Sequence, residues 1–438
     1  MSTPTQKTSP PGEPAPTAPS ARPPRIGVID ALRGLACVFM ITWHCADSWL
    51  VPSLRDTPPF DFARFVGGFA APLFLWLAGL SLALMTPLQP TAEQTQTSLV
   101  RALWVVVVGY GLKLCAWTID HTAVHDAANW LTLLIAFPSV FALGWATREA
   151  RLERARAVAF VAGALALFIA YSNLDGTTRG SVVLARLDVL HGIGAALLVT
   201  TLLLALAGRF VRTEWQRALV LVVLALLVAL ITPHWIGGSL EPIPTRIADY
   251  IARLRQPFAE SGARFPLFPW LGHALSGAAL GTLMRRAKPD LGETELPFKL
   301  HPALVFGLSL IVMFVVFEGG YVAPHLLGRV ESLRPLVRLL FFGALALSLS
   351  CVLSWTGHAS RPTYDALRSL GRSSLLVYGA HLQLAYGLLG LSVRDRLSWP
   401  LYLFGIVLVT ALMLVLVRLL EHFEKRFMKP APQAATTK

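Results

Sequence analysis

Long apolar segments, separated by short clusters of charged residues, run through most of this 438-residue chain. Charged residues make up only 14% of it, whereas soluble domains carry roughly a quarter. A run of about 20 apolar residues crosses a bilayer as a helix, because backbone groups in lipid must be paired within the segment. Alternating segments of the kind that build membrane barrels are absent from the sequence. The sequence therefore predicts an all-α, polytopic transmembrane helical bundle of about 11–12 spanning helices.

The apolar segments define the expected organisation of the chain. Residues 1–24 are rich in Pro, Ser and Thr and are predicted to form a disordered cytoplasmic tail. Residues 25–423 form a single transmembrane domain in this interpretation, and 424–438 form a basic cytoplasmic tail. Spanning helices are expected near 30–50, 64–86, 98–118, 130–147, 155–172, 186–207, 217–236, 264–284, 303–323, 335–355, 371–393 and 400–420. No loop is long enough for a soluble catalytic domain, so any chemistry must take place among the helices.

The net charge of +13 would suggest nucleic acid for a soluble protein. In a membrane protein it indicates Lys and Arg in cytoplasmic loops, and we expect no nucleic-acid partner. The basic loops at Thr147–Arg156, Gly208–Arg217 and Met284–Asp290 alternate correctly if both termini are cytoplasmic. We therefore expect a multi-pass protein of the bacterial inner membrane, with Asp120–Asn129 outside. Neither the cysteines nor the two histidines of Asp120–Asp126 supply a full set of metal ligands, so no metal is expected.

The segment "IDALRGLACVFMITWH" (Ile29–His44) places ionisable residues in the first apolar run. Arg33 and His44 are separated by three helical turns plus roughly 20°, so they share a face and lie about 16 Å apart along the axis. Asp30 lies one turn before Arg33 on that face, and Asp47 lies one turn after His44. Such groups cost several kcal/mol in a membrane unless they face a partner or a watery cavity. This face therefore indicates a polar site within the bundle.

Three other segments carry histidine in apolar surroundings. "RLDVLHGIG" contains Asp188 and His191, "FPWLGHALSGAALG" contains His273, and "LGRSSLLVYGAHL" contains Arg372, Tyr378 and His381. The expected topology brings all four histidines to a similar depth in the outer half of the membrane. It also brings Arg33 and Arg372 to the inner mouth, where guanidinium groups are suited to phosphates. We expect a polar cavity shared by these groups.

The order of these motifs along residues 25–390 resembles the heparan-α-glucosaminide N-acetyltransferase catalytic family. The "GGFAAPLFLWLAGLSLAL" segment (Gly67–Leu84) belongs to the same series. The resemblance implies a polytopic enzyme that moves acetyl from acetyl-CoA onto a sugar amine across a membrane. The Arg33–His44 spacing is also similar to that of membrane acyltransferases that O-acylate surface sugars. The resemblance departs at Val51–Ala63, which lacks the histidine that the animal lysosomal members carry there.

The resemblance implies that His44 is the catalytic base or acyl carrier and that Arg33 supports CoA binding. Acyl transfer also needs an orienting group for the base and a donor for the developing oxyanion. The sequence offers Asp47 for the first role and Tyr378 or a second histidine for the other. The expected residues are His44, Asp47, His381 and Tyr378 for catalysis, Arg33, Arg372 and Asp30 for acetyl-CoA, and His191, Asp188 and His273 for the acceptor.

The expected partners are acyl-CoA from the cytoplasm, a sugar or glycan acceptor and the lipid bilayer. The oligomeric state is left open by the sequence. Two other classes also fit intramembrane His, Asp and Arg: a proton-coupled transporter and a non-catalytic membrane protein. A transporter would be favoured by an inverted repeat, which the sequence does not show.

Overall fold

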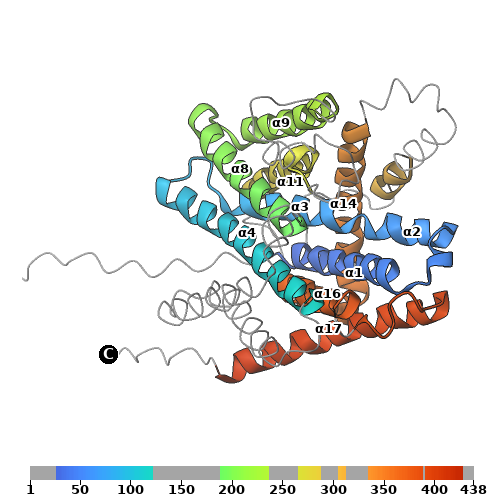
Figure 1. Cartoon of the computed structure of the whole chain (residues 1–438). Helices are drawn as coiled ribbons and strands as arrows, with labels where there is room; N and C mark the ends of the chain where they lie inside the picture. The colour runs from blue at the N-terminus through green and yellow to red at the C-terminus, as the bar shows by residue number, and fades with distance from the viewer. Residues whose placement is uncertain are drawn as a thin grey trace, which may run out of the picture.

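The computed structural model describes residues 26–121, 188–235, 265–287, 304–311, 334–387 and 390–427. Its helices in these ranges pack side by side (Figure 1). The longer ones are α1 (Gly27–Trp49), α3 (Ala70–Met85), α4 (Ala92–His121), α8 (Val189–Phe210), α9 (Glu214–Trp235), α11 (Leu267–Ala287), α14 (Arg334–Ala359) and α17 (Trp399–Phe427). The shorter ones are α2 (Pro58–Gly67), α15 (Arg361–Arg372) and α16 (Ser374–Ala385), and residues 304–311 are also helical.

Several sequence predictions lie outside the described residues. They are the helices at 130–147 and 155–172, most of that at 303–323, the loop at Thr147–Arg156, most of Asp120–Asn129, the tail at 1–24 and all but the first four residues of the tail at 424–438.

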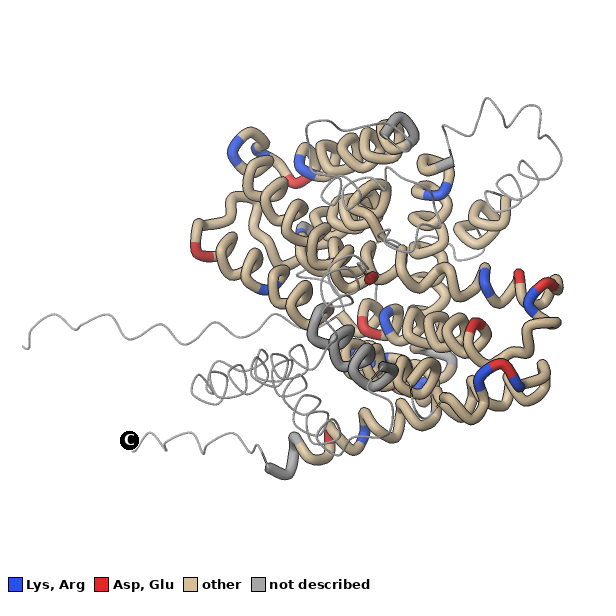
Figure 2. Tube along the Cα trace, in the orientation of Figure 1, with Lys and Arg blue, Asp and Glu red and all other residues tan. Residues whose placement is uncertain are grey.

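Six helical segments in the described ranges are long and apolar enough to cross a membrane. Charged residues lie mainly toward the ends of the helices, with long uncharged stretches between them (Figure 2). These features confirm the predicted all-α, polytopic membrane fold. The exposed side chains of α9 and α17 are largely Leu, Val, Phe and Trp, as expected where helices face lipid.

Two predicted spanning helices are broken in the structure. The segment at 64–86 divides into α2 and α3 at Gly68 and Phe69. The segment at 371–393 also differs from the prediction, because α15 ends at Arg372 and α16 ends at Ala385. The twelve-residue α16 is only about 18 Å long, roughly half a membrane span. The amphipathic α15 buries Tyr364, Leu370 and Gly371 against the bundle and exposes its charged face.

Contacts between helix ends divide the molecule into an Arg33 end and a His44 end. At the Arg33 end, Arg33 contacts Ser81 near the end of α3, and Arg372 contacts Glu421 near the end of α17. At the His44 end, the segment after α1 pairs with the segment before α17 through Leu50 and Leu397. Helix α1 therefore runs from the Arg33 end to the His44 end, whereas α3 and α17 run in the opposite direction. These directions agree with the predicted topology. The side of the membrane on which each end lies stays a prediction.

Glycines allow close approach where the central helices cross. A Cβ on Gly277 would overlap the backbone carbonyl of Trp76, so α3 and α11 meet backbone to backbone. A Cβ on Gly34 would likewise overlap the carbonyl of Leu367, and one on Gly371 would overlap that of Asp30. These last two contacts, at Gly34 and Gly371, seat α15 against the first turns of α1. Small residues at helix crossings are typical of membrane bundles, and here they hold the helix that carries Arg33 and His44.

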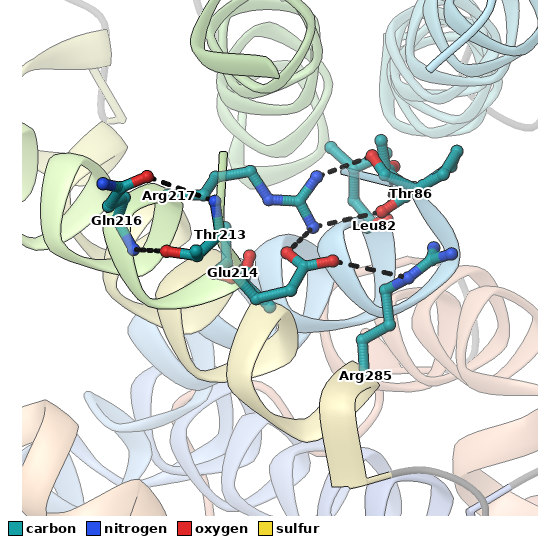
Figure 3. Close-up of polar contacts among 10 residues, drawn as sticks. Leu82, Thr86, Thr213, Glu214, Gln216, Arg217 and Arg285 are labelled. Atoms are coloured by element: carbon teal, nitrogen blue, oxygen red, sulfur yellow. Dashed lines mark hydrogen bonds and ion pairs between the residues drawn. The ribbon is translucent and has the colours of Figure 1, made fainter. Parts of the chain in front are cut away.

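A buried arginine ties three helices together at the Arg33 end (Figure 3). The Arg217 side chain on α9 is fully buried. Its guanidinium donates to the carbonyl oxygens of Pro87 at 2.6 Å and Thr86 at 3.2 Å, and it pairs with Glu214 at 2.8 Å. Arg285 of α11 approaches the same carboxylate at 3.7 Å. The group joins the turn after α3 to α9 and α11.

We expect Arg217→Met to destabilise the protein by about 3–5 kcal/mol, because it leaves two carbonyl groups without their donor and the Glu214 carboxylate with only the more distant Arg285. Thermal unfolding in detergent measures the loss. Arg212→Ala is the matched control, since Arg212 is exposed and lies in the connection that leads into α9. Equal melting temperatures for the two variants would contradict this role for Arg217.

Candidate functional site

Two of the predicted site histidines form a direct pair. The Nδ1 atom of His44 on α1 lies 2.8 Å from the Nε2 atom of His381 on α16. The two rings are nearly parallel, with an interplanar angle of 3°. His381 is fully buried, and its Nδ1 atom lies 2.7 Å from the carbonyl oxygen of Val377, one turn earlier. The prediction that α1 and α16 bring imidazoles to the same depth therefore holds for this pair.

Asp47 joins this pair through an aromatic residue. Its carboxylate accepts a hydrogen bond of 2.7 Å from the hydroxyl of Tyr386. The Tyr386 ring meets the His44 ring in an edge contact, with 5.4 Å between centroids. Arg394 in turn donates to the carbonyl oxygen of Tyr386 at 2.6 Å. Tyr386 thus lies between the predicted orienting carboxylate and the imidazole.

Tyr378 and Asp188 form a second polar link, on the adjacent turn of α16. The Tyr378 hydroxyl donates to Asp188 Oδ2 at 2.7 Å. Asp188 is also the N-cap of α8, because its Oδ1 accepts from the backbone N–H of Val189 at 2.7 Å. His191 completes a capping box by accepting from the backbone N–H of Asp188 through Nδ1 at 3.2 Å. The start of α8 is therefore fixed against α16 by the residues predicted to bind the acceptor.

A cavity of about 450 Å³ lies between α1, α3, α4, α8 and α16. This volume falls in the usual range for small-molecule sites, roughly 300–1,000 Å³. Its wall is mostly apolar and includes Phe74, Val105 and Ile193. Tyr378 contributes to the wall, and the His381 ring lies 6.0 Å from the Tyr378 ring. The cavity therefore reaches the turn of α16 that precedes the histidine pair.

Arginine and serine side chains supply the polar part of this cavity. Arg33 lines it and donates to Asp30 at 2.9 Å and to Ser81. Arg101 of α4 also lines it, together with Ser98 one turn earlier. No hydrogen bond or ion pair joins the Arg101 side chain to another described residue, and it is exposed. The two guanidinium groups are suited to binding an anion.

The other predicted residues lie elsewhere in the fold. Arg372 is paired with Glu421 at 2.9 Å and is absent from the described lining of the cavity. His273 is buried on α11 between aromatic rings, 5.9 Å from Trp270 and 5.4 Å from Phe342 by ring centroids. Within the described ranges, no three His, Cys, Asp or Glu side chains are grouped as metal ligands.

Sequence reasoning missed Arg101, Ser81 and Tyr386. An arginine within the apolar run "SLVRALWVVVV" (Ser98–Val108) was the available signal for the first of them. Nothing in the sequence pattern distinguishes Ser81 or Tyr386 from neighbouring residues of the same type. Together, the site offers an imidazole pair at one end and cations beside an apolar cavity at the other.

Comparison with known proteins adds one match. The family model described as heparan-alpha-glucosaminide N-acetyltransferase, catalytic, matches residues 25–318. The matched region includes α1, α3, α4, α8 and α11, and therefore Arg33, His44 and Asp188. α16, with Tyr378 and His381, lies after it. A search of curated proteins gave no significant match.

Proposed function

The chain belongs to the heparan-alpha-glucosaminide N-acetyltransferase catalytic family, and from this premise we propose that it transfers acetyl from acetyl-CoA to a sugar amine or hydroxyl. The Arg33 end faces the cytoplasm in this proposal, where acyl-CoA is available, and the acceptor binds at the His44 end. The observation that supports it most directly is the cavity, which has guanidinium groups in its wall and reaches the turn of α16 before the histidine pair.

The arginines bind the donor in this proposal. Arg33 and Arg101 hold the phosphates of CoA, since guanidinium groups form charge-assisted hydrogen bonds to phosphate oxygens. The apolar wall then receives the pantetheine arm, which extends toward α16. Asp30 positions Arg33 through their 2.9 Å ion pair.

The histidine pair and the Tyr378–Asp188 link carry the chemistry. His44 removes the proton from the acceptor amine or hydroxyl as that atom bonds to the thioester carbonyl carbon. The C–S bond then breaks, and the CoA sulfur leaves with the proton that His44 had accepted. If His44 instead carries the acetyl group, its nitrogen bonds to the carbonyl carbon first and the acceptor displaces it. In this proposal the Tyr378 hydroxyl releases its hydrogen bond to Asp188 and donates to the oxyanion that forms in either route.

Purified protein in detergent, given acetyl-CoA labelled in the acetyl group, tests the proposal. Transfer to members of a panel of amino sugars and neutral sugars is the expected result. Two variants of the same fold give the comparison: His44→Ala should be inactive, whereas the exposed His422→Ala should match wild type. Proton-coupled transport by the protein in vesicles, without any acetyl transfer, would favour the transporter class instead.

The donor site makes a separate prediction. Arg33→Ala and Arg101→Ala should each raise KM for acetyl-CoA with a smaller effect on kcat, because a phosphate clamp stabilises ground and transition states alike. We expect a change of about 10-fold or more for each, the usual effect of losing a charge-assisted hydrogen bond. Arg372→Ala is the control, since Arg372 pairs with Glu421.

Steady-state kinetics over a range of acetyl-CoA concentrations measure these effects. An unchanged KM in Arg101→Ala would remove Arg101 from the donor site. A KM raised equally in Arg372→Ala would place the phosphates nearer to α15 than the cavity does.

A further inference from the structure

The hydrogen bonds of His381 fix which of its nitrogens carries a proton. Nδ1 lies 2.7 Å from the carbonyl oxygen of Val377. A carbonyl oxygen only accepts hydrogen bonds, so Nδ1 must be the donor. In a neutral imidazole the other nitrogen, Nε2, is then an acceptor.

The surroundings of His381 favour the neutral form. The side chain is fully buried, and a buried charge costs several kcal/mol unless it is paired. In the part of the chain that the structure describes, its polar contacts are with His44 and with the backbone of Val377 and Tyr378, and none of them is a carboxylate. The carboxylates nearest in the network, those of Asp47 and Asp188, accept hydrogen bonds from Tyr386 and Tyr378.

The proton on His44 follows from the same geometry. Its Nδ1 atom faces His381 Nε2 at 2.8 Å, and two acceptor nitrogens would repel at that distance. His44 Nδ1 therefore donates. We propose that His381 is a positioning residue that holds His44 in the Nδ1–H tautomer, so that Nε2 of His44 is the reacting nitrogen.

The catalytic consequence rests on the proposed function. His44 Nε2 takes the acceptor proton, or bonds to the acetyl carbon, and the ring becomes an imidazolium whose Nδ1–H remains bonded to His381. In serine proteases an aspartate performs this orienting role. A neutral histidine performs it here without placing a second charge in the membrane.

Nitrogen NMR of protein labelled with ¹⁵N-histidine tests the tautomer directly. Spectra of His44→Gln and His381→Gln assign the two residues among the eleven histidines of the chain. We expect both imidazoles to be neutral with the proton on Nδ1, and a coupling between His44 Nδ1 and His381 Nε2. A proton on Nε2 of His44, or a charged His381, would overturn the proposal.

A matched pair of variants tests the positioning role in turnover. His381→Gln can place an amide oxygen near the position of Nε2 and still accept from His44. His381→Asn can reach only the Nδ1 position, so it keeps a donor for Val377 and leaves His44 Nδ1–H without an acceptor. We expect the Asn variant to lose kcat by roughly 10²–10⁴-fold, as for a misoriented base, and the Gln variant to retain most of it.

The two measurements separate this proposal from the proposed function. Equal losses in the Gln and Asn variants, together with equal falls in melting temperature, would mean that His381 only packs. If wild type transfers no acetyl group to any acceptor, the proposed function fails. The NMR result would still decide the tautomer, because it requires no substrate.

Discussion

His44→Ala should reduce acetyl transfer by about 10²–10⁴-fold or more, the contribution of a positioned base. The protein should still insert and fold, because the His44 side chain is only partly buried and the α1 backbone is held by Gly34 and its neighbours. Acetyl-CoA binding should persist, since Arg33 and Arg101 are unchanged. Turnover with labelled acetyl-CoA and equilibrium binding of CoA measure the two effects separately.

His44→Asn distinguishes chemistry from packing. The asparagine amide reaches the position of Nδ1, so it can donate to His381 Nε2 and preserve the hydrogen bond of 2.8 Å, but an amide has no basic nitrogen. It should therefore be nearly as inactive as the alanine variant and more stable. Turnover close to wild type in His44→Asn would show that His44 only packs against His381, and would end its assignment as base or acyl carrier.

The relation between Arg33 and His44 could be predicted because both lie on one helix. The helical repeat fixes their common face and their separation along the axis. The alternation of apolar segments then placed His381 at the depth of His44, and the structure brings these two side chains into contact. Periodicity and charge therefore predicted that these two histidines lie at one depth, but not that they are the two of the four that touch.

The partners chosen within the bundle could not be predicted in the same way. Asp47 lies one turn after His44, yet its carboxylate accepts from Tyr386, which directly follows α16. Arg372 lies at the Arg33 end of the bundle as expected, yet it pairs with Glu421. Helical spacing gives a face and a depth, whereas these pairings depend on which helix lies beside that face.

The largest effect expected on stability within the site is that of Asp188→Ala. This substitution removes the N-cap of α8 and the acceptor of the Tyr378 hydroxyl, two bonds of 2.7 Å. Loss of a cap costs about 0.5–2 kcal/mol, and a buried hydroxyl without a partner costs about 1–3 kcal/mol. A clear fall in melting temperature in detergent is therefore expected, together with loss of transfer.

Asp188→Asn separates the charge of this residue from its hydrogen bonds. Asparagine is as effective an N-cap as aspartate, and its amide oxygen can accept from either Val189 or Tyr378. Its melting temperature should lie closer to wild type than that of Asp188→Ala. If the carboxylate also binds the acceptor amine, KM for the amino sugar should rise in Asp188→Asn while KM for acetyl-CoA stays unchanged. An Asn variant with wild-type kinetics would confine Asp188 to capping α8 and holding Tyr378, and the acceptor would then have to bind without this charge.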